Sequence, residues 1–133
     1  MKYIFETEMT VRDYECDLQG IVNNAVYQNY LEHARHEFLH DAGVDFVQLC
    51  EKGIDAVVTR IEIDYKSPLK PSDVFVVRLG VRRQGRLRFV FDQAIVRKAD
   101  GGLVAEAQVH AVLTRNGRPV APTILDGVFA FNK

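Results

Sequence analysis

The sequence predicts an α+β fold in which a curved, five-stranded antiparallel sheet wraps around one long central helix. Three features predict it: an alternating segment near the start of the chain, one long segment with helical periodicity, and four alternating segments in the second half. Alternation of apolar and polar residues indicates a strand with one buried face, whereas apolar residues three and four apart indicate a helix. One helix followed by a run of strands favours a sheet that packs on that helix.

The first predicted strand spans residues 3–11, where apolar and polar side chains alternate. Its inward face is expected to hold Tyr3, Phe5, Thr7, Met9 and Val11. A loop follows at 12–23 and contains Gly20, which permits a sharp turn.

The helix is expected from about Asn24 to Asp41. Asn23 and Asn24 both suit the N-cap position, and Gly43 suits the residue just beyond a helix. Its buried face is expected to hold Tyr30, Ala34 and Phe38, each four residues apart.

Four further strands are predicted at 56–66, 74–82, 86–98 and 103–114, after a short helical turn within 44–52. The first of them should present Val57, Thr59, Ile61, Ile63 and Tyr65 on one face. Prolines or glycine turns separate the strands, and Asn116-Gly117 turns the chain once more. Residues 119–122 are expected to run along the surface, and Thr123 to cap a short helix that contains Ile124, Leu125, Val128 and Phe131.

Length and composition exclude several classes of protein. With 133 residues and 47% hydrophobic content, the chain is expected to form one domain, 1–133. A net charge of -1 gives no general attraction to nucleic acid, and no stretch approaches the roughly 18 apolar residues of a membrane helix. The first residues do not resemble a signal peptide, so the cytoplasm is the expected location. Cys16 and Cys50 are expected to be reduced thiols.

The candidate chemistry lies where the loop meets the helix. Asp17 is seven residues before Asn24, across the turn that Gly20 permits. The free N–H groups of a helix's first turn, together with the positive end of its dipole, stabilise negative charge that develops nearby. A carboxylate beside them suits acyl transfer from a thioester, because it can attack the carbonyl or activate a water. The thiolate leaving group, with a pKa of roughly 8.5, needs little help from an acid.

The same residues resemble a known family. Asp17-x-x-Gly20-x-Val22-x-x-x-x-Tyr27, followed by Tyr30-Leu31-Glu32-x-Ala34-Arg35, resembles the opening motif of the 4-hydroxybenzoyl-CoA thioesterase-like acyl-CoA thioesterases. The resemblance implies the hotdog fold, with Asp17 as nucleophile or general base and the backbone N–H of Asn24 as oxyanion donor.

The resemblance also implies a substrate and an assembly. The substrate would be an acyl-CoA, hydrolysed to a free acid and CoA without a cofactor or a metal. The acyl group would lodge between the subunits of a homodimer or homotetramer. The Asn23-Asn24 pair is common in branches that act on long acyl chains, whereas Ile21 looks more like the branch for aromatic or short acyl groups. Ile21 and Tyr27 are candidate substrate-binding residues, and Tyr27 is alternatively a core residue at the helix start.

Other functions stay open at the level of sequence. A non-catalytic protein that binds acyl-CoA and a thioesterase that acts on acyl carrier protein are the main alternatives. A dehydratase of the same fold would need a histidine near the helix start, where this chain has Ile21 and Asn24. Glu32 and Glu37 on the helix are further candidate carboxylates, because one branch of these thioesterases uses a helix carboxylate.

A second motif has the spacing of a zinc site. Residues 36–40 read His-Glu-Phe-Leu-His, in which two imidazoles one helical turn apart can bind zinc. Helical geometry puts His33, His36 and His40 opposite the apolar face. A solvent-facing or interface stripe is therefore the favoured interpretation, and no metal is expected.

Four arginines surround one predicted hairpin turn. They are Arg82, Arg83, Arg86 and Arg88. Guanidinium groups suit phosphates, so these residues are candidates for binding the nucleotide part of CoA. The alternative is a solvated hairpin whose charges protect an exposed edge.

Overall fold

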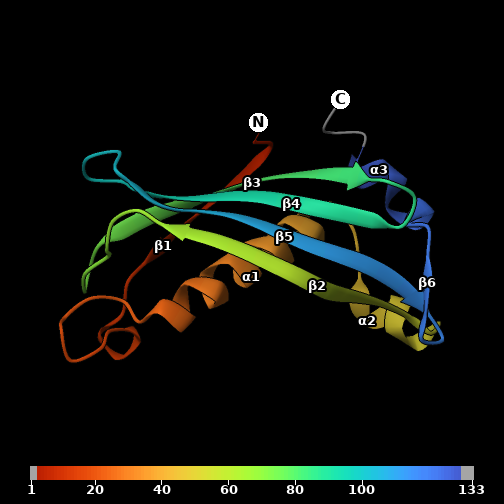
Figure 1. Ribbon diagram of the computed structural model, residues 1–133, viewed down its shortest axis with the longest axis horizontal. Coiled ribbons are helices and arrows are strands. Elements are labelled where there is room, and N and C mark those ends of the chain that lie inside the picture. Colours follow the sequence, from red (N-terminus) through yellow and green to blue (C-terminus); the bar gives the residue numbers. More distant parts are fainter. Residues whose placement is uncertain (1–2, 130–133) are drawn as a thin grey trace.

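The computed structural model describes residues 3–129, in which a curved antiparallel sheet folds around one long helix, α1 (Asn24–Asp41) (Figure 1). The strands lie in the order β1-β3-β4-β5-β2, and a short sixth strand, β6, pairs with β5. The five-stranded path and the single long helix confirm the predicted α+β architecture. The remaining elements are β1 (Phe5–Thr10), α2 (Phe46–Glu51), β2 (Ile54–Tyr65), β3 (Val74–Gln84), β4 (Arg88–Arg97), β5 (Leu103–Arg115), β6 (Arg118–Val120) and α3 (Asp126–Phe129), with short 3-10 turns at Asp13–Glu15 and Thr123–Leu125.

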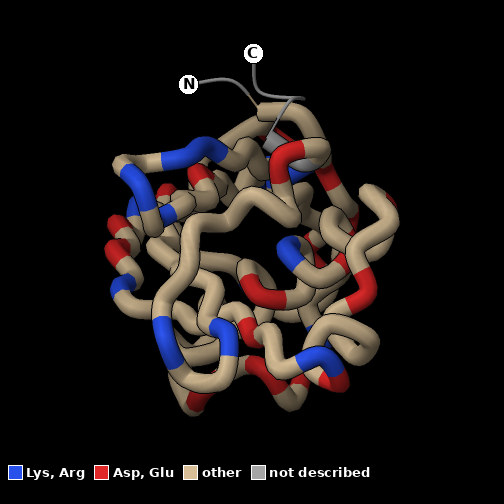
Figure 2. The backbone as a smooth tube through the Cα atoms, turned by 90° about the vertical axis from the view of Figure 1, so that its right-hand side faces the viewer, with Lys and Arg blue, Asp and Glu red and all other residues tan. Residues whose placement is uncertain are grey.

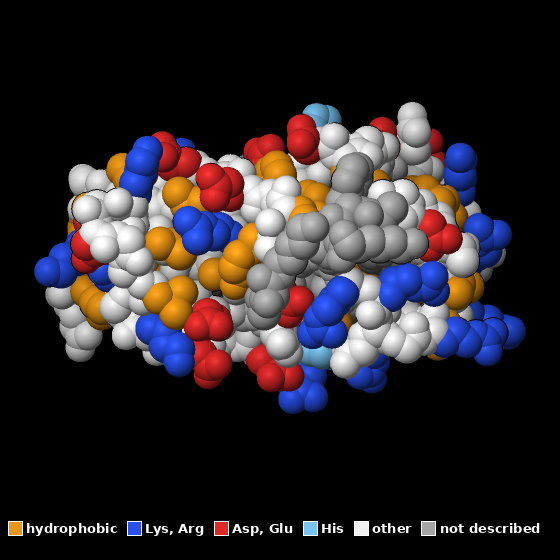
Figure 3. All heavy atoms as spheres, turned by 90° about the horizontal axis from the view of Figure 1, so that it is seen from above, with side chains coloured by type: hydrophobic (Ala, Val, Ile, Leu, Met, Phe, Trp, Pro, Cys, Tyr) orange, Lys and Arg blue, Asp and Glu red, His pale blue; other side chains and the backbone are white. Residues whose placement is uncertain are grey.

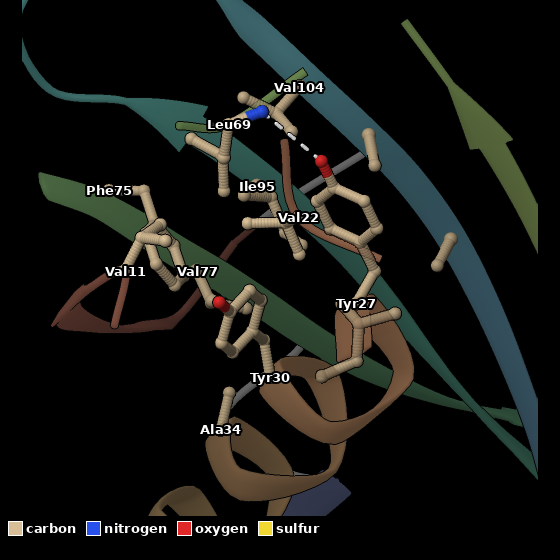
Figure 4. Close-up of a cluster of buried hydrophobic side chains, with 13 residues drawn as sticks. Val11, Val22, Tyr27, Tyr30, Ala34, Leu69, Phe75, Val77, Ile95 and Val104 are labelled. Carbon is tan, nitrogen blue, oxygen red and sulfur yellow. Dashed lines mark hydrogen bonds between the residues drawn. The ribbon is translucent and has the colours of Figure 1, made fainter. Parts of the chain in front are cut away.

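The core lies between α1 and the concave side of the sheet (Figure 4). The ring of Tyr30 packs on that of Phe75, with the centroids 4.6 Å apart. The alternation predicted for β3 and β5 is confirmed, since every second side chain is buried. These inward residues are Phe75, Val77, Leu79 and Val81 of β3, and Ala105, Ala107, Val109, Ala111 and Leu113 of β5.

The helix begins at the predicted residue, but its cap is Asn23 alone. The side chain of Asn23 accepts a hydrogen bond from the N–H of Ala25, at 2.9 Å. Asn24 is the first helical residue, so the expectation that its side chain could cap the helix is wrong. The reason is that a cap must have extended backbone, which Asn23 has with φ -65° and ψ 140°.

The register of β2 corrects the predicted face of this strand. β2 pairs with β5, but the pairing shifts between Val58 and Arg60 at a β-bulge. An extra residue moves alternate side chains to the other face of the sheet. Before the bulge, Ala56 and Val58 face α1 and line a cavity beside it, so the prediction that Val57 shares one face with Ile61 and the later residues of the strand is wrong.

The segment after β5 also differs from the prediction. Residues 118–120 form β6, where an irregular surface segment was expected. β4 pairs with β5 only as far as Val112, and β6 pairs with β5 beyond that point. Pro119 is compatible with this strand because β6 has a free edge. Pro122, not Thr123, occupies the N-cap position of the next turn, and Phe131 lies outside the described residues.

Two surface features follow from this topology. β2 is an edge strand with unusually exposed apolar residues: Val57, Val58, Ile61 and Tyr65 are 37–47% exposed. Charged residues of both signs are interspersed along the backbone (Figure 2), in keeping with the net charge of -1. Across residues 3–129 there is no helix with the length and apolar character needed to cross a membrane.

Candidate active site

The Asp17 loop is a small hairpin closed by backbone hydrogen bonds. The N–H of Asp17 donates to the carbonyl of Ile21 at 2.9 Å, and the N–H of Gly20 donates back to the carbonyl of Asp17 at 3.0 Å. Gly20 has φ +77°, a left-handed conformation that other residues adopt only with strain. The predicted requirement for glycine at this turn is therefore confirmed.

Further bonds fix the hairpin beside the start of α1. The N–H of Asn23 donates to the carbonyl of Glu15 at 3.0 Å, and the N–H of Val22 donates to the carbonyl of Leu69 at 2.9 Å. Val22 is only 1% exposed, so its side chain anchors the loop in the core. The Asp17 loop and the helix start consequently form one rigid unit.

The carboxylate of Asp17 is exposed and only partly engaged. Its Oδ1 accepts the backbone N–H of Gln19 at 2.8 Å. Among the described residues it forms no ion pair, in contrast to Asp92, which pairs with Arg82. The bond to Gln19 orients the carboxylate and leaves Oδ2 available for chemistry.

The backbone N–H of Asn24 has no acceptor within the part of the chain that the structure describes. Of the next two donors, Ala25 bonds to the Asn23 side chain and Val26 to the Asn23 carbonyl, each at 2.9 Å. The hydroxyl of Tyr65 donates to the carbonyl of Asn24 at 3.3 Å, which ties the helix start to the end of β2. An oriented and unused N–H at the positive end of a helix is what an oxyanion needs.

Glu15 is a structural carboxylate that sequence reasoning missed. Its Oε1 accepts the backbone N–H of Arg12 and the hydroxyl of Tyr30, both at 2.8 Å. Burial, and then the bond to Glu15, raise the pKa of Tyr30. The sequence offers three acidic residues at 13, 15 and 17, and nothing in their spacing tells which one is held by the core.

The other predicted residues of the helix start lie inside the molecule. Tyr27 is 3% exposed, and its hydroxyl accepts the backbone N–H of Leu69 at 3.2 Å. Burial is the main cause that raises the pKa of Tyr27. Tyr27 thus belongs to the core cluster shown in Figure 4, and Ile21 is half-buried beside the loop.

The arginines of the β3–β4 hairpin do not form one cluster. The Nε of Arg82 donates to Asp92 at 2.9 Å, whereas Arg83 pairs with Asp126 at 3.3 Å. Neighbouring strand residues point to opposite faces, which explains this divergence. The hairpin lies at the end of the protomer opposite the Asp17 loop (Figure 1), where basic side chains also gather in Figure 3. Within one chain these arginines therefore lie away from Asp17, and their binding of the nucleotide part of CoA stays a prediction.

The histidines of α1 lie on its exposed side, as predicted. His33 pairs with Glu37 at 3.2 Å, and His36 and His40 are exposed. In the described chain, no three His, Cys, Asp or Glu side chains lie close enough together to hold a metal ion.

A cavity of about 300 Å³ lies between α1 and the first half of β2. Its walls are largely apolar, and Glu32, Asp55 and His36 lie among the polar residues that line it. Sequence reasoning missed this cavity, because it forms from α1, α2 and three strands that are far apart in the chain. The apolar walls include Leu39, Phe46, Ile54, Val58, Phe89 and Phe91.

Comparison with known proteins gives a consistent result. The sequence profile of the thioesterase-like superfamily matches residues 11–128. Acyl-acyl carrier protein thioesterase ATL3 of Arabidopsis thaliana, a chloroplast protein, is 37% identical over 90% of this chain and 64% of its own length. Long-chain acyl-CoA thioesterase FadM of Escherichia coli is 30% identical over 80% of each chain. The chain thus spans less than two thirds of the length of the Arabidopsis relative.

Solved structures agree on the fold. A hypothetical protein from Aquifex aeolicus has a TM-score of 0.85 at 31% identity, covering 93% of this chain and 98% of its own. A 1,4-dihydroxy-2-naphthoyl-CoA thioesterase from Synechocystis has a TM-score of 0.89 at 20% identity, covering 95% of each chain.

Proposed function

Because the chain belongs to the thioesterase-like superfamily, we propose that it hydrolyses the thioester bond of an acyl-CoA or an acyl-acyl carrier protein. The products are the free acid and the thiol of the carrier. Two relatives support the class of reaction, and they leave the carrier open, because one is named for acyl carrier protein and the other for CoA. The fold is the hotdog fold of these thioesterases.

The mechanism rests on two groups that lie on the same rigid unit. One is the carboxylate of Asp17, of which only Oδ1 accepts a hydrogen bond, and the other is the backbone N–H of Asn24, which has no acceptor among the described residues. The N–H of Asn24 polarises the thioester carbonyl and holds the oxyanion that forms on it. Asp17 then acts in one of two ways. As a base, it takes a proton from water while the hydroxide adds to the carbonyl carbon; the tetrahedral intermediate expels the thiolate, which receives the proton. As a nucleophile, it adds to the carbonyl carbon and expels the thiolate, which leaves a mixed anhydride; water then hydrolyses this anhydride to the free acid and the Asp17 carboxylate, and the thiolate takes up the released proton.

The test of this proposal is thiol release from a panel of short, long and aromatic acyl-CoAs and from acyl carrier protein substrates. Asp17→Asn should lower kcat by roughly a hundredfold or more, because it removes the base or nucleophile but keeps the shape and the bond from Gln19. Glu15→Gln serves as the comparison, since Glu15 is held by the core. If Asp17→Asn is as active as the wild type in a folded protein, Asp17 has no role in the chemistry.

We propose that two copies pair along their β2 strands in a homodimer, and a homotetramer would be built from such pairs. The support is the exposed apolar edge of β2, because an unpaired edge of this kind templates pairing with another chain. In an antiparallel, two-fold pairing the start of one β2 lies beside the end of the other. The mass in solution, measured by light scattering, should be at least twice that of one chain; a fully active monomer would contradict the pairing.

This pairing completes the site. The start of α1 is tied to the end of β2 through Tyr65, and the 300 Å³ cavity adjoins the start of β2. Two-fold pairing therefore sets the catalytic unit of one protomer beside the cavity of its partner. We assign the acyl group to that cavity. The two-fold pairing also brings the partner's basic hairpin, which includes Arg86 and Arg88, towards the end of the site where the carrier would bind.

A further inference from the structure

One buried cation at the cavity between α1 and β2 forms no ion pair with any side chain that the structure describes. Arg35 of α1 is 7% exposed, yet it lines the cavity. Its Nη1 donates to the Oε1 of Gln93 at 3.1 Å, and the Nε2 of Gln93 donates to the carbonyl of Leu31 at 3.0 Å. The guanidinium carbon lies 6.0 Å from the centre of the Phe91 ring. Arg35 is thus held in place by an amide and an aromatic ring, both neutral.

The charge of Arg35 is poorly compensated. None of the ion pairs among residues 3–129 includes it. Burial lowers the pKa of Arg35, and the carboxylate of Glu32 offsets this only in part. A buried charge is costly unless it is paired, so this arrangement calls for an anion or a strong acceptor that residues 3–129 do not provide.

The unused donors of Arg35 face the cavity. An arginine has five N–H donors, and one bond to Gln93 satisfies one of them. The fully buried side-chain atoms without a partner in the described residues belong to Asp92 and His110, not to Arg35. The remaining donors therefore reach accessible space, and that space is the cavity that Arg35 lines.

The other charged groups at the cavity do not cancel this preference. Glu32 and Asp55 also line it, but both are exposed, so water screens their charges. His36 is exposed too. Arg35 is consequently the one buried charge among the described lining residues, and the two carboxylates lie where water reaches them.

We propose that Arg35 selects acyl groups that carry an acceptor oxygen remote from the thioester, with a carboxylate as the best fit. A carboxylate accepts two N–H groups of one guanidinium at once, and this geometry gives both strength and orientation. The rings of Phe89 and Phe91 line the same cavity, and their apolar surface suits the carbon chain of such an acyl group. This inference rests on the proposed thioesterase function and on the acyl group occupying the partner's cavity.

The alternative is that Arg35 only fastens α1 to β4 through Gln93. In that case its removal lowers the stability of the protein without changing the ranking of substrates. A comparison of substrates within each variant separates the two roles, because a loss of folded protein affects all substrates alike.

The test compares glutaryl-CoA with pentanoyl-CoA, which have five acyl carbons each and differ by a terminal carboxylate. The wild type should prefer glutaryl-CoA by roughly tenfold or more in kcat/KM, the effect of a hydrogen bond to a charged group. Arg35→Met should abolish or reverse this preference, and Arg35→Lys should keep part of it. Arg118→Met, which changes an exposed arginine on β6, should leave the preference unchanged.

A binding measurement covers the case in which Arg35→Met fails to fold. In the wild-type protein, glutarate should shift the NMR resonance of the Arg35 Nε–H group, and the neutral pentanamide should shift it far less. No shift with glutarate, or equal use of the two CoA esters by the wild type, overturns the role of Arg35. If neither ester nor any other acyl thioester is hydrolysed, the proposed function itself fails; if hydrolysis depends on Asp17 but not on the terminal carboxylate, only this inference does.

Discussion

Two adjacent asparagines have different roles at the start of α1. The side chain of Asn23 satisfies one helix donor, whereas the backbone N–H of Asn24 is the proposed oxyanion donor. Asn23→Ala should therefore lower the free energy of unfolding by about 1 kcal/mol, and Asn24→Ala by much less. Urea denaturation of both variants measures this difference. Asn24→Ala should also keep most of the turnover because its N–H remains, and a stability loss larger at Asn24 than at Asn23 would contradict the assignment of the cap.

Tyr30 makes stability sensitive to alkaline pH. Its pKa is raised in the folded protein, so above roughly pH 10 the tyrosine of the unfolded chain ionises while Tyr30 in the folded chain keeps its proton. The unfolded state then binds fewer protons, and stability falls as pH rises. The slope should be steeper than in Tyr30→Phe, and the difference should approach about 1.4 kcal/mol per pH unit once the pH exceeds the unfolded pKa of roughly 10. Urea denaturation between pH 9 and pH 11 measures it.

The exposed Tyr14 provides the matched control for this experiment. It is 75% exposed, so Tyr14→Phe removes a tyrosine hydroxyl outside the core and serves as the comparison for Tyr30→Phe. An identical slope in wild type and Tyr30→Phe would show that Tyr30 ionises equally in both states, and the bond to Glu15 would then contribute nothing.

At the scale of single residues, local chemistry was predictable and packing was not. Gly20 was predicted because a tight turn between Asp17 and Ile21 has few other solutions, and the structure gives it φ +77°. Gln93 and Arg35 were missed. Gln93 interrupts the apolar face of β4, and the only sign in the sequence is a polar residue at an inward position. Its partner is 58 residues away, so local patterns do not connect them.

At the scale of elements, the bounds of α1 were predicted well because both ends carry local signals. Asn23 caps the start, and Gly43, with φ +82°, follows the end. The bulge in β2 was missed because it is set by pairing with β5, and alternation by itself assumes an unbroken register. β6 was missed because Pro119 argues against a central strand, and only the topology shows that this strand lies at an edge.

At the scale of the whole molecule, the Asp17 loop and the cavity lie at opposite ends of β2 in the folded chain. The cavity adjoins the start of β2 and the loop adjoins its end, so under the proposed pairing each chain supplies one half of each of two sites. No single segment of the sequence indicates that the Asp17 loop and the cavity lie apart. This separation explains why Asp17 and Asn24 could be proposed from a motif, whereas the acyl pocket could be proposed only from the folded chain and its pairing.

The proposed pairing gives the β2 edge a role in catalysis as well as in assembly. Replacing Val57 and Ile61 together by lysine should prevent strand pairing, because charges on an edge strand oppose the approach of a second strand. We expect this double variant to be folded and monomeric by light scattering, with kcat/KM lowered by roughly a hundredfold or more, since a misplaced acyl group loses the benefit of orientation. Val47→Lys, on the exposed side of α2 at 71% exposure, should stay oligomeric and active. A monomeric double variant with wild-type turnover would mean that one chain holds a complete site, and the acyl group would then have to lie near its own Asn24 instead of in the partner's cavity.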